Sequence, residues 1–174
     1  MTTYRFELTL SGDVAGSVDA LYEAGWDDAG VSGDDFGGSA EFDRDAPSAV
    51  HAVASAIEQA ENAGLEVTGV TEDLVTLGEI AERAGRTLAA VDNWVHGRRG
   101  PGSFPDPRIP RARAALYSWA DVATWLSTHG LAEISDADLE IARACVIIDA
   151  ALKTRDGLRR LPAAERRRVA RLVA

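Results

Sequence analysis

Apolar residues occupy every second position near the start of the chain, which is the period of a strand with one buried face. The four apolar positions are Tyr4, Phe6, Leu8 and Leu10. Further along, segments whose apolar residues have the spacing of a helix alternate with segments that have the spacing of a strand. The pattern predicts two helices, over 14–25 and 48–63, and three further strands, over 29–32, 40–43 and 65–70. The first module therefore has the order strand, helix, strand, strand, helix, strand.

This order is that of the ferredoxin-like split βαβ plan, in which one sheet is covered by two helices. We expect an α+β protein whose residues 1–71 form such a ferredoxin-like βαββαβ module. By analogy of fold, the module would serve dimerisation, sensing of a small ligand or binding of a protein partner. The helical positions predicted to be buried are Val14, Val18, Leu21, Tyr22, Val50, Val53, Ile57 and Ala60.

Two short amphipathic helices are predicted next. Thr76 and Glu79 have the spacing of a capping box, so the first helix should begin at about Leu77. Gly85 suits the left-handed conformation that ends a helix, and Thr87 can cap the second one. The connection is too short for antiparallel helices that lie apart, so they must cross steeply, as in a helix-turn-helix. Their apolar faces hold Leu77, Ile80, Ala81 and Ala84, and then Leu88, Val91, Trp94 and Val95.

A loop rich in Gly, Pro and Arg leaves the second helix and leads to a third. It reaches a short predicted strand at 115–117, after which Ser118 and Asp121 have the spacing of a second capping box. The helix that follows carries Trp119 and Trp125 at apolar positions. These tryptophans, together with Trp94, are expected in the core of this domain because their spacing follows the apolar faces.

These motifs resemble a known family. The spacing Ala81-x3-Gly85-x5-Val91-x2-Trp94 is similar to the helix-turn-helix core, and HGRRGPGSFPDPRIPRARAALYSWADVATWL resembles the wing and closing helix of excisionase and MerR-like proteins. The resemblance covers residues 74–128. It implies a winged helix-turn-helix domain over 72–130, bound to double-stranded DNA, in a transcriptional regulator.

The exposed positions of this domain indicate how DNA would be held. Asn93 and His96 suit contacts to base edges, whereas Asp92 would face a polyanion. Arg86 stands in the turn, where the family usually has a small apolar residue. We therefore expect contacts with phosphates to outweigh readout of bases. The predicted DNA-binding residues are Arg86, Thr87, Ala89, Asn93, His96, Arg98, Arg99, Arg111 and Arg113.

Residues 131–174 are predicted to form C-terminal helices. Ser135 and Asp138 form a third box-like cap, and Pro162 suits the first turn of the last helix. The first of these helices has an apolar face so broad that it needs cover from two sides, either by the winged helix or by a second copy. Because MerR-like proteins commonly dimerise through a helix after the winged domain, the resemblance implies a homodimer. The broad face comprises Leu139, Ile141, Ala142, Cys145, Val146, Ile148 and Leu152.

The last helix and the residues before it are the most basic part of the chain. Three interpretations remain open: further contacts with phosphate, a solvated face, or salt-linked docking onto the acidic first module. The arginines concerned are Arg159, Arg160, Arg166, Arg167, Arg168 and Arg171.

The charge of −10 is unevenly distributed along the chain. Residues 1–75 hold 16 acidic and 2 basic side chains, a balance of −14, whereas residues 76–130 hold 5 and 7, and residues 131–174 hold 7 and 9. Since salt screens charges beyond roughly 8 Å, a separate acidic module need not abolish DNA binding by its neighbour.

Other chemistry finds little support in the sequence. The carboxylates at 27–28 and 34–35 lack the spacing of a calcium loop, so we expect no metal site. Neither His51 nor His129 has a nucleophile nearby in sequence, so we expect no cofactor and no enzymatic activity. The single cysteine, Cys145, cannot form an internal disulfide. Without a leader or a long apolar run, a cytoplasmic protein with no membrane contact is expected. The alternative function is that of an adaptor or antitoxin-type protein whose winged helix does not read DNA.

Overall fold

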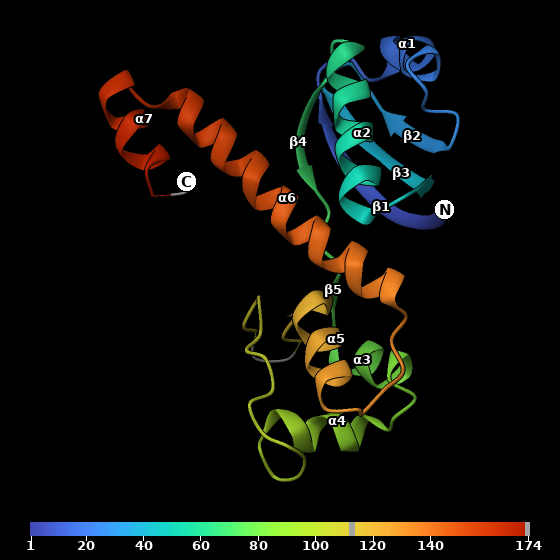
Figure 1. Cartoon of the computed structure of the whole chain (residues 1–174), viewed down its shortest axis with the longest axis vertical. Helices are drawn as coiled ribbons and strands as arrows, with labels where there is room; N and C mark the ends of the chain where they lie inside the picture. Colours follow the sequence, from blue (N-terminus) through green and yellow to red (C-terminus); the bar gives the residue numbers. More distant parts are fainter. Residues whose placement is uncertain (112–113, 173–174) are drawn as a thin grey trace. The chain divides into compact units, whose positions relative to one another are not determined.

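The computed structural model describes residues 1–111 and 114–172. The protein is α+β, with a four-stranded antiparallel sheet and, among the described residues, seven α-helices (Figure 1). It divides into two compact units. Unit 1 contains Met1–Thr71 and the described residues from Ala144 onwards, and unit 2 contains Glu72–Arg143.

The sheet of unit 1 has the order β2-β3-β1-β4, and every neighbouring pair of strands is antiparallel. Its strands are β1 (Thr2–Ser11), β2 (Ala29–Gly33), β3 (Gly37–Ala46) and β4 (Glu66–Val70). The predicted alternation in β1 is confirmed, because Tyr4, Phe6, Leu8 and Leu10 are all buried. Phe6 lies opposite Phe42 of β3, and their rings stack with centroids 4.7 Å apart.

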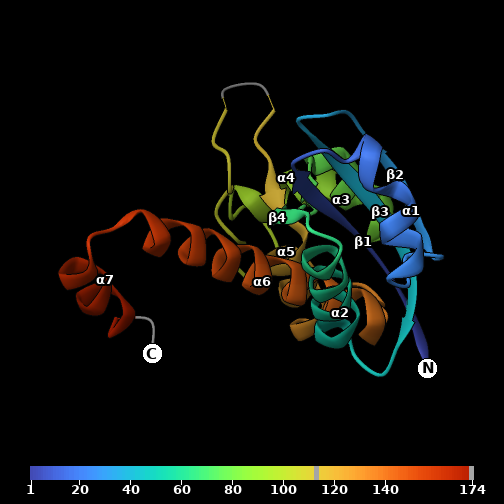
Figure 2. The same ribbon diagram turned by 90° about the horizontal axis from the view of Figure 1, so that it is seen from above.

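Two helices accompany the sheet. The 3₁₀ turn η1 (Ala15–Ser17) leads into α1 (Val18–Glu23), and α2 (Ala49–Asn62) lies across one face of the sheet (Figures 1 and 2). The predicted burial of Val18, Tyr22 and Val50 is wrong, since these side chains are 45%, 66% and 56% exposed. Alanines take the place of Val50 in the contact of α2 with the sheet, because small side chains let the helix approach closely. The buried alanines of α2 are Ala49, Ala52, Ala56 and Ala60.

A buried arginine fastens the loop after α1 to β3 and α2. Arg44 is 6% exposed, and its guanidinium forms two bonds to Asp28, from Nε to Oδ2 at 2.7 Å and from Nη2 to Oδ1 at 2.8 Å. It also donates to the carbonyl of Gly25 and to the side chains of Ser55 and Gln59. Every donor direction of this fork is thereby occupied, which is what makes a buried charge tolerable.

Helix α6 (Asp136–Arg160) begins in unit 2 and continues into unit 1. Its second half covers the free edge of β4. The buried carboxylate of Asp149 accepts from the Val70 N–H at 3.2 Å, and Lys153 binds the same carboxylate at 2.6 Å. Further along, Arg155 donates to the Val67 carbonyl. Side chains of α6 thus satisfy backbone groups that would remain open at an edge strand.

Unit 2 is built from short elements. Its strands β5 (Leu74–Val75) and β6 (Tyr117–Ser118) pair antiparallel, and its helices are α3 (Leu77–Arg83), α4 (Leu88–Val95) and α5 (Trp119–Thr128). The second capping box is wrong. Ser118 precedes α5, but its hydroxyl makes no cap hydrogen bond and is buried without a partner among the described residues.

The C-terminal part ends in α7 (Ala163–Ala170), which buries none of its described residues. The cap before α6 is confirmed, since the Asp138 N–H donates to Ser135 Oγ at 3.1 Å. On α6, Leu139, Ala142, Cys145 and Leu152 are buried as expected. Among the described residues, no helix combines the length and the apolar character that a bilayer span requires.

Candidate nucleic-acid interface

Helices α3 and α4 are joined by a tight turn. The capping box of α3 is confirmed: Glu79 N–H donates to Thr76 Oγ1, and Thr76 N–H donates to Glu79 Oε2 at 2.7 Å. These bonds favour the ionised carboxylate and hold the pKa of Glu79 below its usual value. Gly85 ends α3 with a φ of +60°, and Thr87 caps α4 by accepting from the Ala90 N–H.

The predicted site residue Arg86 has a structural partner. Its backbone N–H donates to the Ala81 carbonyl at 2.8 Å. Its side chain donates through Nε and Nη2 to the Leu131 carbonyl, at 3.1 and 2.7 Å. Arg86 therefore ties the turn to the segment after α5, and only the rest of its exposed guanidinium is left for another ligand.

The outer face of α4 is small and mostly uncharged. Ala89 is exposed, and so is Leu88, at 55%, which corrects its predicted place on the buried face. Val91 and Trp94 form the buried face. Asn93 is half-buried, and its backbone carbonyl accepts from the N–H groups of the residues that follow α4. The α4 surface thus offers few polar groups for reading bases.

Asp92 is already engaged with two of the predicted DNA-binding side chains. Arg98 Nη1 lies 2.8 Å from Asp92 Oδ2, and His96 Nδ1 lies 3.2 Å from Asp92 Oδ1. His96 Nδ1 is also within 2.8 Å of the Asp92 carbonyl. Asp92 therefore neutralises part of the positive charge at the end of α4, where a phosphate would otherwise be attracted.

Residues 97–111 and 114–116 form an arm that leaves α4 and returns to β6. Trp94 packs so closely on Gly100 that a Cβ there would lie 2.5 Å from the indole, and Gly100 has a φ of +102°. Trp125 Nε1 donates to the Gly102 carbonyl at 3.0 Å, and the Phe104 ring contacts Trp125 edge-on with centroids 5.0 Å apart. These aromatic contacts fix the course of the first half of the arm.

The second half of the arm is pinned by one bridge between Ile109 and Leu116. Phe104 also packs on Tyr117 of β6. Burial, with the nearby carboxylate of Asp106, raises the pKa of the Tyr117 hydroxyl. The strand predicted at 115–117 is thus replaced by this bridge and by the two residues of β6.

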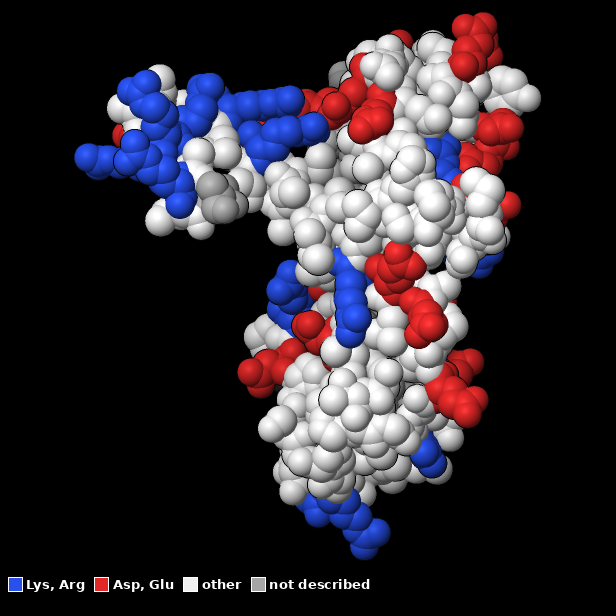
Figure 3. Space-filling view, viewed as in Figure 1, with Lys and Arg blue, Asp and Glu red and all other residues white. Residues whose placement is uncertain are grey.

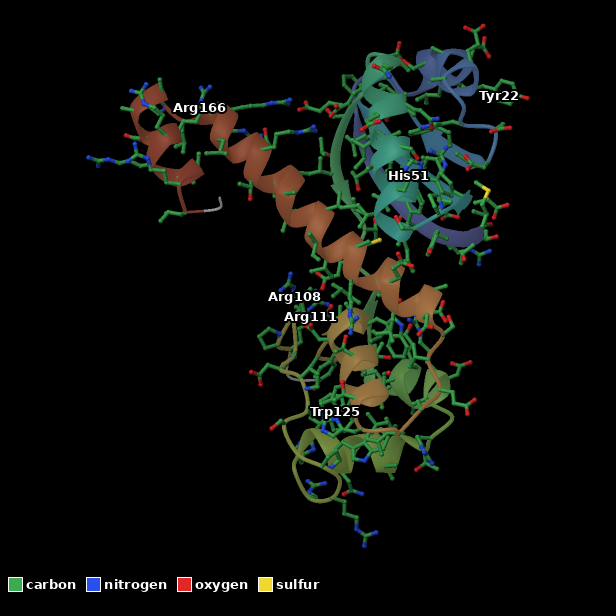
Figure 4. All side chains as sticks on the ribbon, viewed as in Figure 1. Tyr22, His51, Arg108, Arg111, Trp125 and Arg166 are labelled. Atoms are coloured by element: carbon green, nitrogen blue, oxygen red, sulfur yellow. The ribbon has the colours of Figure 1, made fainter. Side chains whose placement is uncertain are left out.

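The arginines of the arm differ in what they contact. Arg108, which the sequence did not single out, pairs with Glu72 at 3.2 Å. Arg99 and Arg111 are exposed and have no side-chain partner among the described residues. Figure 4 labels Arg111. Arg113 lies outside the described residues. Arg99 and Arg111 are consequently the predicted site residues that the fold leaves most available to an anion.

An open hollow lies between the arm and α5. Pro105 and Pro107 line one side, and Thr124 and Thr128 of α5 line the other. Its charged lining is mixed, because Asp106 and Asp121 face it together with Arg108.

Comparisons of the chain with models of protein families, with curated proteins and with solved structures find no match.

Proposed function

We propose that the protein is a DNA-binding transcriptional regulator in which unit 2 acts as a winged helix-turn-helix of the excisionase and MerR-like kind. The observation that carries the proposal is the arrangement of α3, a tight turn and α4, followed by an arginine-bearing arm that returns to β6 beside β5. An exposed second helix with a basic loop next to it is the layout with which winged helices hold a duplex. The arm would be the wing.

Unit 1 would be the ferredoxin-like module of this regulator. Its order β2-β3-β1-β4 with antiparallel neighbours is the order that such a split βαβ plan requires, which supports this assignment. Its uncovered face is polar: Glu7 lies opposite Glu41, and Arg5 pairs with Asp43 at 2.7 Å. We propose dimerisation, ligand sensing or partner binding for this unit by analogy of fold.

Within unit 2, the wing would grip phosphates and α4 would read few bases. Arg99 and Arg111 are free to pair with phosphate, whereas Arg98 must first exchange Asp92 for it. Asn93 and His96 remain the α4 side chains able to specify a base. Binding should therefore depend steeply on salt and only modestly on sequence.

A titration of labelled double-stranded DNA at a series of salt concentrations tests this proposal. Each lost phosphate contact should lower the slope of log K against log salt by roughly 0.9. We expect this loss for Arg99→Ala and for Arg111→Ala, and a smaller one for Arg98→Ala, which serves as the matched control because Asp92 already neutralises it. Equal slopes for all three variants and the unchanged protein would contradict a wing that grips phosphate.

Base readout has a separate test. Asn93→Ala should cost about 1 to 3 kcal/mol on the preferred sequence and little on random DNA. The preferred sequence is first obtained by selecting bound duplexes from a random pool. If selection enriches nothing while binding persists, α4 reads no bases.

A second function, that of an adaptor or antitoxin-type protein, is favoured by the charge of unit 2. Residues 72–143 hold 8 arginines against 11 aspartates and glutamates, a balance of −3. Such a balance weakens non-specific attraction to DNA. Absence of DNA binding at both low and moderate salt, together with a protein partner that co-purifies and is released by Arg99→Ala, would establish this alternative.

A further inference from the structure

The basic residues near the C-terminus fall into two groups with different surroundings. The last three arginines of α6 have carboxylate partners: Arg155 pairs with Glu61 at 2.6 Å, and Arg159 pairs with Glu66 at 2.8 Å. Arg160 pairs with Asp156 at 2.7 Å, within the helix. Of the arginines for which the sequence left salt-linked docking onto the acidic module open, Arg159 makes such a contact, through Glu66.

The arginines of α7 lack such partners. Arg167, Arg168 and Arg171 are exposed and form no ion pair or hydrogen bond among the described residues. Their spacing of i, i+1 and i+4 places them on one side of the helix, within about one turn of 5.4 Å. Arg166 differs, since its Nη2 donates to the Leu161 carbonyl at 3.2 Å. Figure 3 shows basic side chains gathered over α7.

This cluster is not explained by the folding of α7 itself. The helix has eight residues and buries none of them, and a helix this short is marginal in water without packing. Arg167 and Arg168 stand in the last turn, where the helix dipole favours cations, but Arg167 and Arg171, the C-cap residue, are like charges at i,i+4. Glu165 is the one acidic side chain of α7. A polyanion that lies along this side would remove the repulsion between the arginines and would hold the helix.

We propose that α7 is a second contact with double-stranded DNA, binding the phosphate backbone through Arg167, Arg168 and Arg171. Three guanidiniums without partners match closely spaced phosphates, which they bind by bidentate hydrogen bonds. An acidic protein surface is a weaker match, since the duplex carries one charge per roughly 1.7 Å of its axis. The contact carries no sequence information, and it adds affinity to the proposed winged helix, on whose DNA binding the inference rests.

The test compares two variants that lose the same charge. The first is Arg167→Gln with Arg168→Gln and Arg171→Gln, and the second, the control, is Arg155→Gln with Arg159→Gln and Arg160→Gln. Each is titrated in the full-length protein with a random-sequence duplex between about 50 and 200 mM salt, the range in which phosphate contacts dominate affinity. Thermal melting of both variants confirms that they fold.

We expect the α7 variant to lower the salt slope by about 2 to 3 and to weaken binding at low salt roughly ten-fold or more. The control should change the slope by less than half as much, because its arginines are already paired. An unchanged slope for a folded α7 variant overturns the inference and leaves the winged helix standing. A change of oligomer mass in that variant, in place of a change of slope, also overturns the inference, because the arginines would then contact protein.

Two further outcomes separate this inference from the proposed function. If the slope depends on α7 but not on Arg99 or Arg111, the inference stands and the proposed wing is wrong. If the unchanged protein does not bind the duplex at any salt concentration, both are overturned.

Discussion

In unit 1 the buried polar side chains are bonded on all sides, whereas in unit 2 several polar side chains of α4 and the arm remain at the surface. Arg44 and Asp149 are examples of the first kind. Arg44 binds Asp28 in the loop after α1, and Asp149 of α6 accepts a hydrogen bond from Val70 of β4. Arg99 and Arg111 show the second. A charge that the fold uses internally supports stability, and a charge that the fold leaves open is available to a ligand.

The difference has a physical origin in how each unit is built. Unit 1 has a four-stranded sheet whose covered face must accommodate a guanidinium, so burial forces Arg44 to find partners. The strands of unit 2 have two residues each, and its arm is held by aromatic rings, by an indole hydrogen bond and by the bridge between Ile109 and Leu116. Its arginines can therefore point outward without a penalty of desolvation.

The largest effect is expected where the charge is buried. Arg44→Met leaves the Asp28 carboxylate without its partner and should lower the free energy of unfolding by about 3 to 5 kcal/mol. Arg5→Met is the matched control, since Arg5 lies on the other face of the same sheet and pairs with Asp43 in solvent. Urea unfolding followed by circular dichroism measures both. Similar free energies of unfolding for the two variants would contradict the distinction between buried and open charge.

Substitutions of two tryptophans, one in each unit, allow the effect of losing an indole hydrogen bond to be compared between the units. Trp125→Phe removes the hydrogen bond to Gly102 and should cost about 1 to 2 kcal/mol, since a carbonyl loses its donor. Trp26→Phe removes the same kind of bond to the Ala56 carbonyl in unit 1. We expect similar losses of stability, but reduced DNA affinity only for Trp125→Phe, because only that indole positions the arm. Equal DNA affinities would show that the arm does not need this bond.

Removing the helix caps of unit 2 should cause a smaller loss of stability, and for the cap that contains Glu79 this loss should depend on pH. Thr76→Ala should cost about 1 kcal/mol at neutral pH, as should Thr87→Ala. Because the pKa of Glu79 is lower in the folded protein than its usual 4.5, its ionised form contributes stability above that value, which is lost as pH falls through the folded pKa. Glu79→Gln should therefore flatten the dependence of melting temperature on acid pH. Thr87→Ala, whose cap contains no carboxylate, should leave that dependence unchanged.

The smallest effect concerns the surface pair at the end of α4. Asp92→Ala frees Arg98 and removes a negative charge, so DNA should bind about two- to five-fold more tightly at low salt, and the gain should fade as salt rises. Asp106→Ala, on the arm but without an ion pair among the described residues, is the comparison. Weaker binding of Asp92→Ala would mean that Asp92 positions Arg98 for DNA rather than withholding it.

Short-range sequence patterns predicted most of the helices and strands, but few of the ion pairs and hydrogen bonds of the candidate site. The alternation in β1 and the caps at Thr76 and Thr87 are present as expected, because each depends on residues a few positions apart. The box at Ser118 is wrong, because the serine hydroxyl is buried and makes no cap hydrogen bond. From the sequence, Asp92 was expected to disfavour DNA. No sequence pattern indicated that Asp92 pairs with Arg98, because this ion pair depends on how the chain turns at Gly97.

The sequence by itself determined the helices, the strands of unit 1 and the glycines that end the helices, since strand period, caps and left-handed turns are local properties of the backbone. It did not determine β5 or the bounds of β6. Only the tertiary structure decided that Arg44 is buried against Asp28, 16 residues away, and that Asp149 bonds to Val70, 79 residues away. It also decided that α6 is shared by two units, and that Arg155 and Arg159 are paired with carboxylates while Arg167 and Arg168 have no partner among the described residues. The physical reason is that pairing depends on which surfaces meet, and residues distant along the chain meet only after packing has placed them.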